Sequence, residues 1–274
     1  MNHKDMSAVI EDKLKEINRL LPKILKEFNH RNIDEFMLEV RKLTAFLRMA
    51  YLNEEEESQK AVIPPLLKIF TRYVRVIQNI QLQEHRTFQY ITTYMADQPY
   101  EYLKLLNMKK KYWQGEAASL MEDNNFDRVK DEVIKRMPRK IHASQIRKFS
   151  LSHLQNLAAI NALHHETQIH AALSILRDLL YLWDYLNVES LFWGAILSKD
   201  GLQTIVQALE EFKNICCGLE LMQPEYLAKI HDEKEKNLLS VFQKSLLARK
   251  NDIREKTRQE LNVLSKEIYQ GELF

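Results

Sequence analysis

The chain has 274 residues, of which 45% are hydrophobic and 28% charged, and its 40 lysines and arginines nearly balance its 38 aspartates and glutamates. This composition argues against a disordered chain, which would have fewer apolar residues and a net charge larger than +2. Only 5 residues are glycine, although hairpin turns, phosphate-binding loops and dinucleotide-binding folds depend on glycine. We therefore predict an all-α fold of antiparallel helical hairpins, packed as a bundle or a short α-solenoid, with a long C-terminal helix.

The first 50 residues predict two helices that form a hairpin. Apolar residues recur every three or four positions from Ile10 to Phe28, as on one face of a helix, and Pro22 predicts a kink or a break there. Asn32, followed three residues later by Glu35, has the spacing of a capping box and is expected to open the second helix.

Proline marks the start of the next two predicted helices. The third opens near Pro64 and Pro65, after an acidic run at residues 54–57, and the fourth opens after Pro99. A short helix over Phe126–Met137 follows the fourth, and we expect these two helices to pair as a second hairpin.

The middle of the chain predicts helices whose boundaries lack proline and glycine. No such residue occurs from Arg139 to Trp193, and a single helix of that length would be far longer than globular proteins use. We expect a break capped by Ser150 or Ser152, and a second candidate break at residues 164–165. Two adjacent apolar stripes over Ile169–Leu186 then predict a central core helix.

The last third predicts two further helices and a long charged one. Asn187 is expected to cap a short helix ending at Leu197, and residues 199–201 to form a turn. An amphipathic helix is predicted over Leu202–Gly218. The charged stretch after Pro224 predicts a long helix that either projects as a coiled coil or lies across the bundle.

These elements suggest a division of the chain into two parts. We expect an N-terminal helical hairpin region over residues 1–97 and a C-terminal helical-repeat-like region over residues 98–274, with one continuous domain over residues 1–274 as the alternative.

Cysteine usage and hydropathy indicate the compartment. Cys216 and Cys217 are adjacent, and a disulfide between neighbours would be badly strained. Residues 1–14 lack the apolar core of a signal peptide, and no window approaches 18 uncharged apolar residues. We therefore expect a protein of a reducing compartment, such as the cytoplasm.

The strongest metal candidate in the sequence is the cluster of His164, His165, Glu166 and His170. A helical zinc hydrolase needs two histidines four residues apart with a glutamate after the first, but His165-Glu166 is followed by His170, five residues after His165. A di-iron bundle needs Glu and His three residues apart, and these are four apart. We therefore expect no metal, no cofactor and no catalytic residue. The alternative is an enzyme or cofactor binder using His165, His170 and Asp178 in the bundle interior.

Charge is unevenly distributed along the chain. Between Lys104 and Lys148 there are 12 lysines and arginines against 6 aspartates and glutamates. A basic stretch with adjoining aromatic side chains could engage a protein partner, and the alternative is a solvated face. The candidate partner-binding residues are Lys109, Lys110, Lys111, Tyr112, Arg136, Arg139, Lys140, Arg147 and Lys148. A pI of about 8.3 does not favour nucleic acid, and an anionic lipid surface is the third alternative.

The paired helices resemble interaction proteins built from tetratricopeptide-type helical repeats, most closely over residues 99–138. Trp113 and Gly115 stand two residues apart there, not in the W-x2-L-G spacing of the family. The resemblance implies stacked hairpins with a concave groove for a partner peptide or helix. In its glycine-poor, Lys/Glu/Asn-rich composition and its C-terminus, residues 271–274, the chain is also similar to effectors that intracellular bacteria export by type IV secretion.

These observations favour a non-enzymatic protein-interaction or regulatory module. The effector resemblance implies delivery into a host cytosol as the alternative to a cytoplasmic location.

Overall fold

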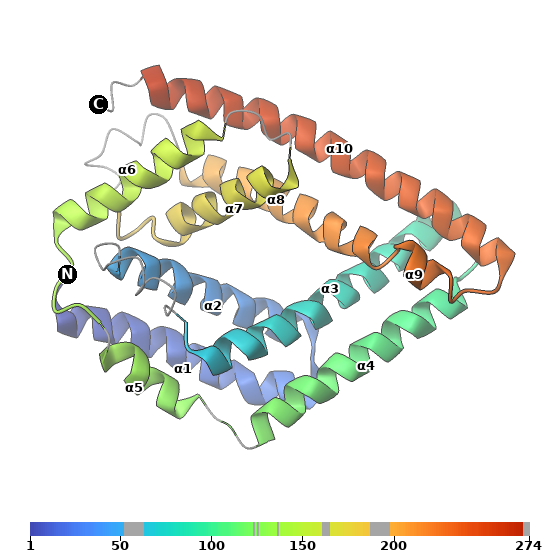
Figure 1. The fold of residues 1–274 in the computed structure, drawn as a ribbon, viewed down its shortest axis with the longest axis horizontal. Helices are drawn as coiled ribbons and strands as arrows, with labels where there is room; N and C mark the ends of the chain where they lie inside the picture. Colours follow the sequence, from blue (N-terminus) through green and yellow to red (C-terminus); the bar gives the residue numbers. More distant parts are fainter. Residues whose placement is uncertain are drawn as a thin grey trace.

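The computed structural model describes residues 1–51, 63–122, 124, 126–135, 137–160, 165–186 and 198–270. Within these ranges the chain forms ten α-helices and no β-sheet, which confirms the predicted all-α fold (Figure 1). The helices are α1 (His3–Glu27), α2 (His30–Ala50), α3 (Pro65–Tyr94), α4 (Tyr100–Glu122), α5 (Asp127–Lys135), α6 (Ala143–Ala159), α7 (Glu166–Tyr181), α8 (Lys199–Glu220), α9 (Pro224–Leu227) and α10 (Glu233–Gln270).

The helices pack in the same order in the two halves of the chain. In the first half, α1 packs on α2, α2 on α3 and α3 on α4. In the second half, α6 packs on α7, α7 on α8 and α8 on α10. The halves meet where α2 contacts α7 and α3 contacts α8. These four helices therefore form the centre of the molecule, and the outer helices surround them (Figure 1).

The N-terminal hairpin forms as predicted, with two differences in detail. Helix α1 continues through Pro22 to Glu27, so the alternative of a break at this proline is wrong. The next residue, Phe28, is in the left-handed region with φ 46°, which turns the chain between the helices. The side chain of Asn29, not that of Asn32, caps α2 by accepting a hydrogen bond from the Asn32 backbone N–H at 3.2 Å.

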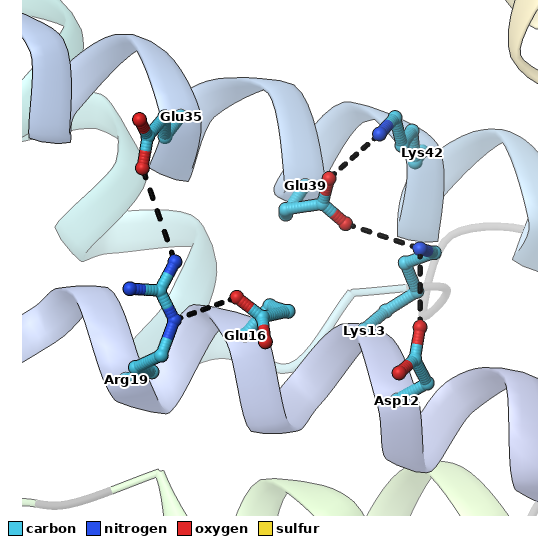
Figure 2. Close-up of polar contacts among 7 residues, drawn as sticks. All are labelled: Asp12, Lys13, Glu16, Arg19, Glu35, Glu39 and Lys42. Carbon is cyan, nitrogen blue, oxygen red and sulfur yellow. Dashed lines mark hydrogen bonds and ion pairs between the residues drawn. The ribbon is translucent and has the colours of Figure 1, made fainter.

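Two separate groups of ion pairs join α1 and α2 along one side of the hairpin (Figure 2). One contains Asp12, Lys13, Glu39 and Lys42, and the other contains Glu16, Arg19 and Glu35. Lys13 of α1 lies 3.3 Å from Glu39 of α2, and Arg19 contacts Glu35 at 3.9 Å. Lys13, Arg19 and Lys42 are each paired with a carboxylate of the same hairpin, so these three cations are not free to bind an anionic ligand.

The middle boundaries are partly as predicted. His165 is the N-cap of α7, which confirms the break expected at residues 164–165. Helix α6 instead runs through Ser150, whose hydroxyl donates to the Ile146 carbonyl at 3.0 Å, so the break predicted at Ser150 or Ser152 is wrong. The turn predicted at residues 199–201 is the first turn of α8, capped by Ser198. The helix predicted over residues 187–197 lies outside the described residues.

The long C-terminal helix lies across the bundle and does not project from it. Helix α10 packs along α8 and α6 and buries an apolar face that includes Leu239 and Phe242. Near its start the Glu235 carboxylate accepts hydrogen bonds from the backbone N–H groups of Glu101 and Tyr102, at 3.1 and 2.6 Å. This carboxylate satisfies free donors at the N-terminus of α4 and so joins the two helices.

Among the described helices, none combines the length and apolar character needed to cross a membrane.

Gly218 of α8 permits a close approach to α3. A Cβ atom at this position would overlap the Oε1 atom of Gln83, a fully buried side chain whose Nε2 donates to the Tyr102 hydroxyl at 3.0 Å. We expect Gly218→Ala to lower the free energy of unfolding by about 1–3 kcal/mol, because Gln83 must leave its hydrogen bond or α8 must move. Urea denaturation monitored by circular dichroism measures this change.

The matched control is Gly115→Ala in α4. Apart from its chain neighbours and the backbone of α4 itself, no atom of a described residue lies within 4 Å of the position of a Cβ there. Alanine favours a helix interior over glycine, so this variant is expected to gain about 0.5–1 kcal/mol. Equal effects of the two substitutions would contradict the packing explanation.

Candidate functional site

A cavity of about 900 Å³ lies between α2, α3, α7 and α8, where the two halves of the chain meet. Among the residues that the structure describes, seven cationic side chains from all four helices line it, against one carboxylate, that of Asp178. The cationic residues are Arg41 and Arg48 of α2, Lys68, Arg72 and Arg75 of α3, Arg177 of α7 and Lys213 of α8. The cavity is therefore strongly electropositive, and its size falls within the range of small-molecule sites.

Helical spacing explains how α2 and α3 direct their cations to the same space. Arg41 and Arg48 are seven residues apart, as are Lys68 and Arg75, and seven residues make about two helical turns. Each pair therefore lies on one face of its helix. Apolar residues such as Phe70 and Val74 face the core from other sides of α3.

One carboxylate holds the two deepest arginines in place. Glu210 of α8 accepts hydrogen bonds from Arg177 Nε at 2.6 Å and Arg41 Nη1 at 3.2 Å, through the same oxygen. Arg41 and Arg177 are each the twelfth residue of their helix, counted from His30 and from Glu166. The two halves thus contribute corresponding arginines to one ion-pair cluster, and Glu210 fixes both guanidinium groups at the cavity wall.

A second carboxylate anchors the far end of α2. Asp178 has a side chain only 7% exposed, and it accepts hydrogen bonds from Arg48 Nη1 at 2.8 and 3.1 Å. His153 of α6 approaches the same carboxylate at 3.4 Å, while Ser174 also accepts from Arg48 at 3.2 Å. Arg48 is therefore neutralised locally and joins α2 to α7.

Four of the lining cations have no such partner. Lys68, Arg72, Arg75 and Lys213 make no ion pair or hydrogen bond through their side chains with any residue that the structure describes. Burial, followed by the charges of Arg75, Arg177 and Arg41, lowers the pKa of Lys213 to about 8. Burial is the largest cause of this lowered pKa, and the three like charges add to it.

The pKa values of two further lining groups shift in the same direction. Burial and then the Arg41 charge lower the pKa of Arg177, and the nearby Glu210 opposes the shift. Loss of solvation and then the Lys213 charge lower the pKa of His170. The positive potential therefore extends across the cavity from α8 to α7, and it favours entry of an anion.

On α4, some side chains of the predicted basic stretch contact other residues of the protein and some are exposed. Lys109 lies over the ring of Tyr226, 4.4 Å from its centroid, and also contacts the Tyr226 hydroxyl. Lys110 forms an ion pair with Glu84 at 2.6 Å. Lys111 is exposed, as is Tyr112, whose ring contacts Trp113 edge-on.

The rest of the stretch lies elsewhere. Arg139 and Lys140 precede α6, where Lys140 forms an isolated bridge with Asn2, while Arg147 and Lys148 are exposed on α6. Arg136 is outside the described residues. Because α4 and α6 lie on opposite sides of the molecule (Figure 1), the stretch does not form one surface, and its binding of a partner stays a prediction.

The residues of the alternative enzyme or cofactor site, His165, His170 and Asp178, do not all lie together. His170 and Asp178 both line the cavity, whereas His165 caps α7 and is exposed. Among the described residues, no group of three or more His, Cys, Asp or Glu side chains is arranged to hold a metal ion.

Comparisons with known proteins show the fold alone. No family model matches the chain, and no curated protein matches it in sequence. A solved structure, PptA from Streptomyces chartreusis, is similar with a TM-score of 0.65 and 12% sequence identity. The match covers 94% of this chain and 98% of PptA, so nearly the whole helical arrangement is shared.

Proposed function

We propose that this protein is a non-enzymatic binding module that holds a small, multiply charged anion in the cavity between α2, α3, α7 and α8. The observation that carries the proposal is the set of four lining cations without an ion-pair partner among the described residues. Like charges that face a shared cavity destabilise the empty fold, and an anion would offset that repulsion. The proposal places the site in this cavity and not on the basic stretch of α4 and α6.

The shape of the site supports a small ligand over a large acidic surface. Four helices wall the cavity, and Arg41, Arg177 and Lys213 are at least half-buried within it. Charge-assisted hydrogen bonds from partly buried arginines are stronger than those from exposed lysines. Arg72 and Arg75, which are more exposed, lie where they can meet a ligand as it enters.

Thermal unfolding with added sulfate or inorganic phosphate tests the proposal. We expect the melting temperature of the wild-type protein to rise with either anion, but not with chloride at matched ionic strength. The double variant Arg72→Met, Arg75→Met should weaken sulfate binding at least tenfold, because two charge-assisted hydrogen bonds of about 1.5–3 kcal/mol each are lost.

The matched control removes two exposed cations of the basic stretch, through Lys111→Met and Arg147→Met. This variant should bind sulfate as the wild type does. Equal loss of binding in both variants would show that net charge, and not the cavity, attracts the anion. Absence of any sulfate effect on the wild type would disprove the proposed function.

A further inference from the structure

Lys213 shares the cavity with arginines from three other helices. It projects from α8 and is half-buried, and the charges of Arg41, Arg75 and Arg177 act on it from α2, α3 and α7. Guanidinium groups from three different helices therefore line the same cavity as this amine. Arginine stays protonated under all ordinary conditions, so only the Lys213 amine can reduce the repulsion among these cations by losing its proton.

The carboxylates near Lys213 are engaged by other cations. Glu210, one turn earlier on α8, binds Arg41 and Arg177. On the side where α10 packs against α8, Glu211 pairs with Arg249, and Lys250 contacts Glu166.

The remaining titratable groups near Lys213 give it little support. Cys217, one turn later on α8, stays a neutral thiol at pH 7, because burial raises its pKa. His170 of α7 is kept neutral by its own lowered pKa. Glu220, further along α8, acts on Cys217 and His170, but no carboxylate among the described residues forms an ion pair with Lys213.

We propose that Lys213 takes up a proton from solvent when an anion enters the cavity, so that anion binding is coupled to proton uptake and weakens as the pH rises. This inference rests on the proposed function and adds its regulation. An anion placed among Arg41, Arg75 and Lys213 supplies the counter-charge that the empty cavity lacks, and it stabilises the ammonium form of Lys213. The same cavity thereby responds to pH although its arginines do not titrate.

The pH window follows from the sign of the pKa shift. Without a ligand the pKa of Lys213 is about 8, below the ordinary lysine value, and a bound anion raises it. Below pH 8 the amine is already charged, and binding takes up little proton. Above pH 8 each bound anion must bring a proton with it, so affinity falls as the pH rises toward the pKa of the complex.

Isothermal titration calorimetry with sodium sulfate tests this coupling, because sulfate keeps its charge throughout the range used. With a free pKa of about 8, the sulfate Kd of the wild type should rise about eightfold between pH 7.5 and pH 9 at constant ionic strength. Titrations at pH 8.5 in two buffers of different ionisation enthalpy should show uptake of about 0.8 proton per sulfate. In the free protein His170 is already neutral at these pH values, because its pKa is lowered.

Lys213→Arg is the decisive variant, because arginine keeps the positive charge but does not titrate. It should retain sulfate binding at pH 7.5 with less than a twofold change in Kd up to pH 9. Lys244→Arg, on the exposed side of α10, is the matched control and should keep the wild-type pH dependence.

Three outcomes would overturn the inference. A pH dependence that persists in Lys213→Arg would assign the proton to another group and leave the proposed function standing. Absence of proton uptake by the wild type in the two-buffer titrations would show that binding is not coupled to a proton, and it would also leave the proposed function standing. Absence of sulfate binding at pH 7.5 would remove both the inference and the proposed function.

Discussion

Replacing Glu210 by glutamine is expected to lower the free energy of unfolding by about 2–4 kcal/mol at pH 7. One Glu210 oxygen accepts from both Arg41 and Arg177, whose side chains are 25% and 14% exposed. A glutamine oxygen can accept hydrogen bonds but carries no charge, so the two arginines would repel each other and the unpaired cations nearby. Urea denaturation with comparison of the midpoint and the m-value measures the loss.

Glu211→Gln provides a matched control one residue further along α8. Glu211 pairs with Arg249 at 3.1 Å, but both side chains are well exposed, so this substitution should cost about 0.2–1 kcal/mol.

A second readout separates a structural from a functional role of Glu210. If the cavity binds anions, sulfate should stabilise Glu210→Gln more than it stabilises the wild type, because sulfate can replace the lost carboxylate charge. Equal stabilisation would contradict the assignment of Glu210 as the counter-charge of the site.

The helices of this fold can be predicted from the spacing of apolar residues, but several of their ends cannot. The stripe from Ile10 to Phe28 predicts α1 correctly, although Pro22 misleads because its side chain is accommodated within the helix. Ser150 looks like a cap, yet its hydroxyl bonds to the carbonyl four residues earlier inside α6. A serine or asparagine side chain can cap a helix or bond to a carbonyl within it, and tertiary packing decides which of the two occurs.

The cavity could not be predicted, because no single segment contains it. Local charge density directs attention to Lys109–Lys111, where cations are consecutive and therefore point in different directions around a helix. The cations of the cavity are spaced along α2 and α3 and meet Arg177 and Lys213 only after the two halves pack together. The seven-residue spacing of Arg41 and Arg48 does indicate that both lie on one face of α2. It points to a cavity only when the helices that pack against that face are known.

Phe70→Ala is expected to lower the free energy of unfolding by about 3–5 kcal/mol, the largest loss predicted for a single substitution in this chain. Phe70 is fully buried, and its ring packs edge-on against Phe36 of α2 at 5.4 Å and Phe126 before α5 at 5.7 Å. Removing it leaves a cavity and breaks both aromatic contacts. Phe88→Ala on the same helix is the control, since Phe88 is 48% exposed and should change stability by about 0.5 kcal/mol or less.

The position of Phe70 also connects the core to the anion site. It stands between Lys68 and Arg72 on α3, so its ring holds the turn that carries two of the unpaired cations. We therefore expect Phe70→Ala to weaken sulfate binding under conditions in which the protein remains folded, whereas Phe88→Ala should not. Phe70→Leu, which keeps most of the buried volume, should recover most of both properties. A variant that loses stability but binds sulfate normally would show that the cavity is held by its ion pairs and not by the aromatic core.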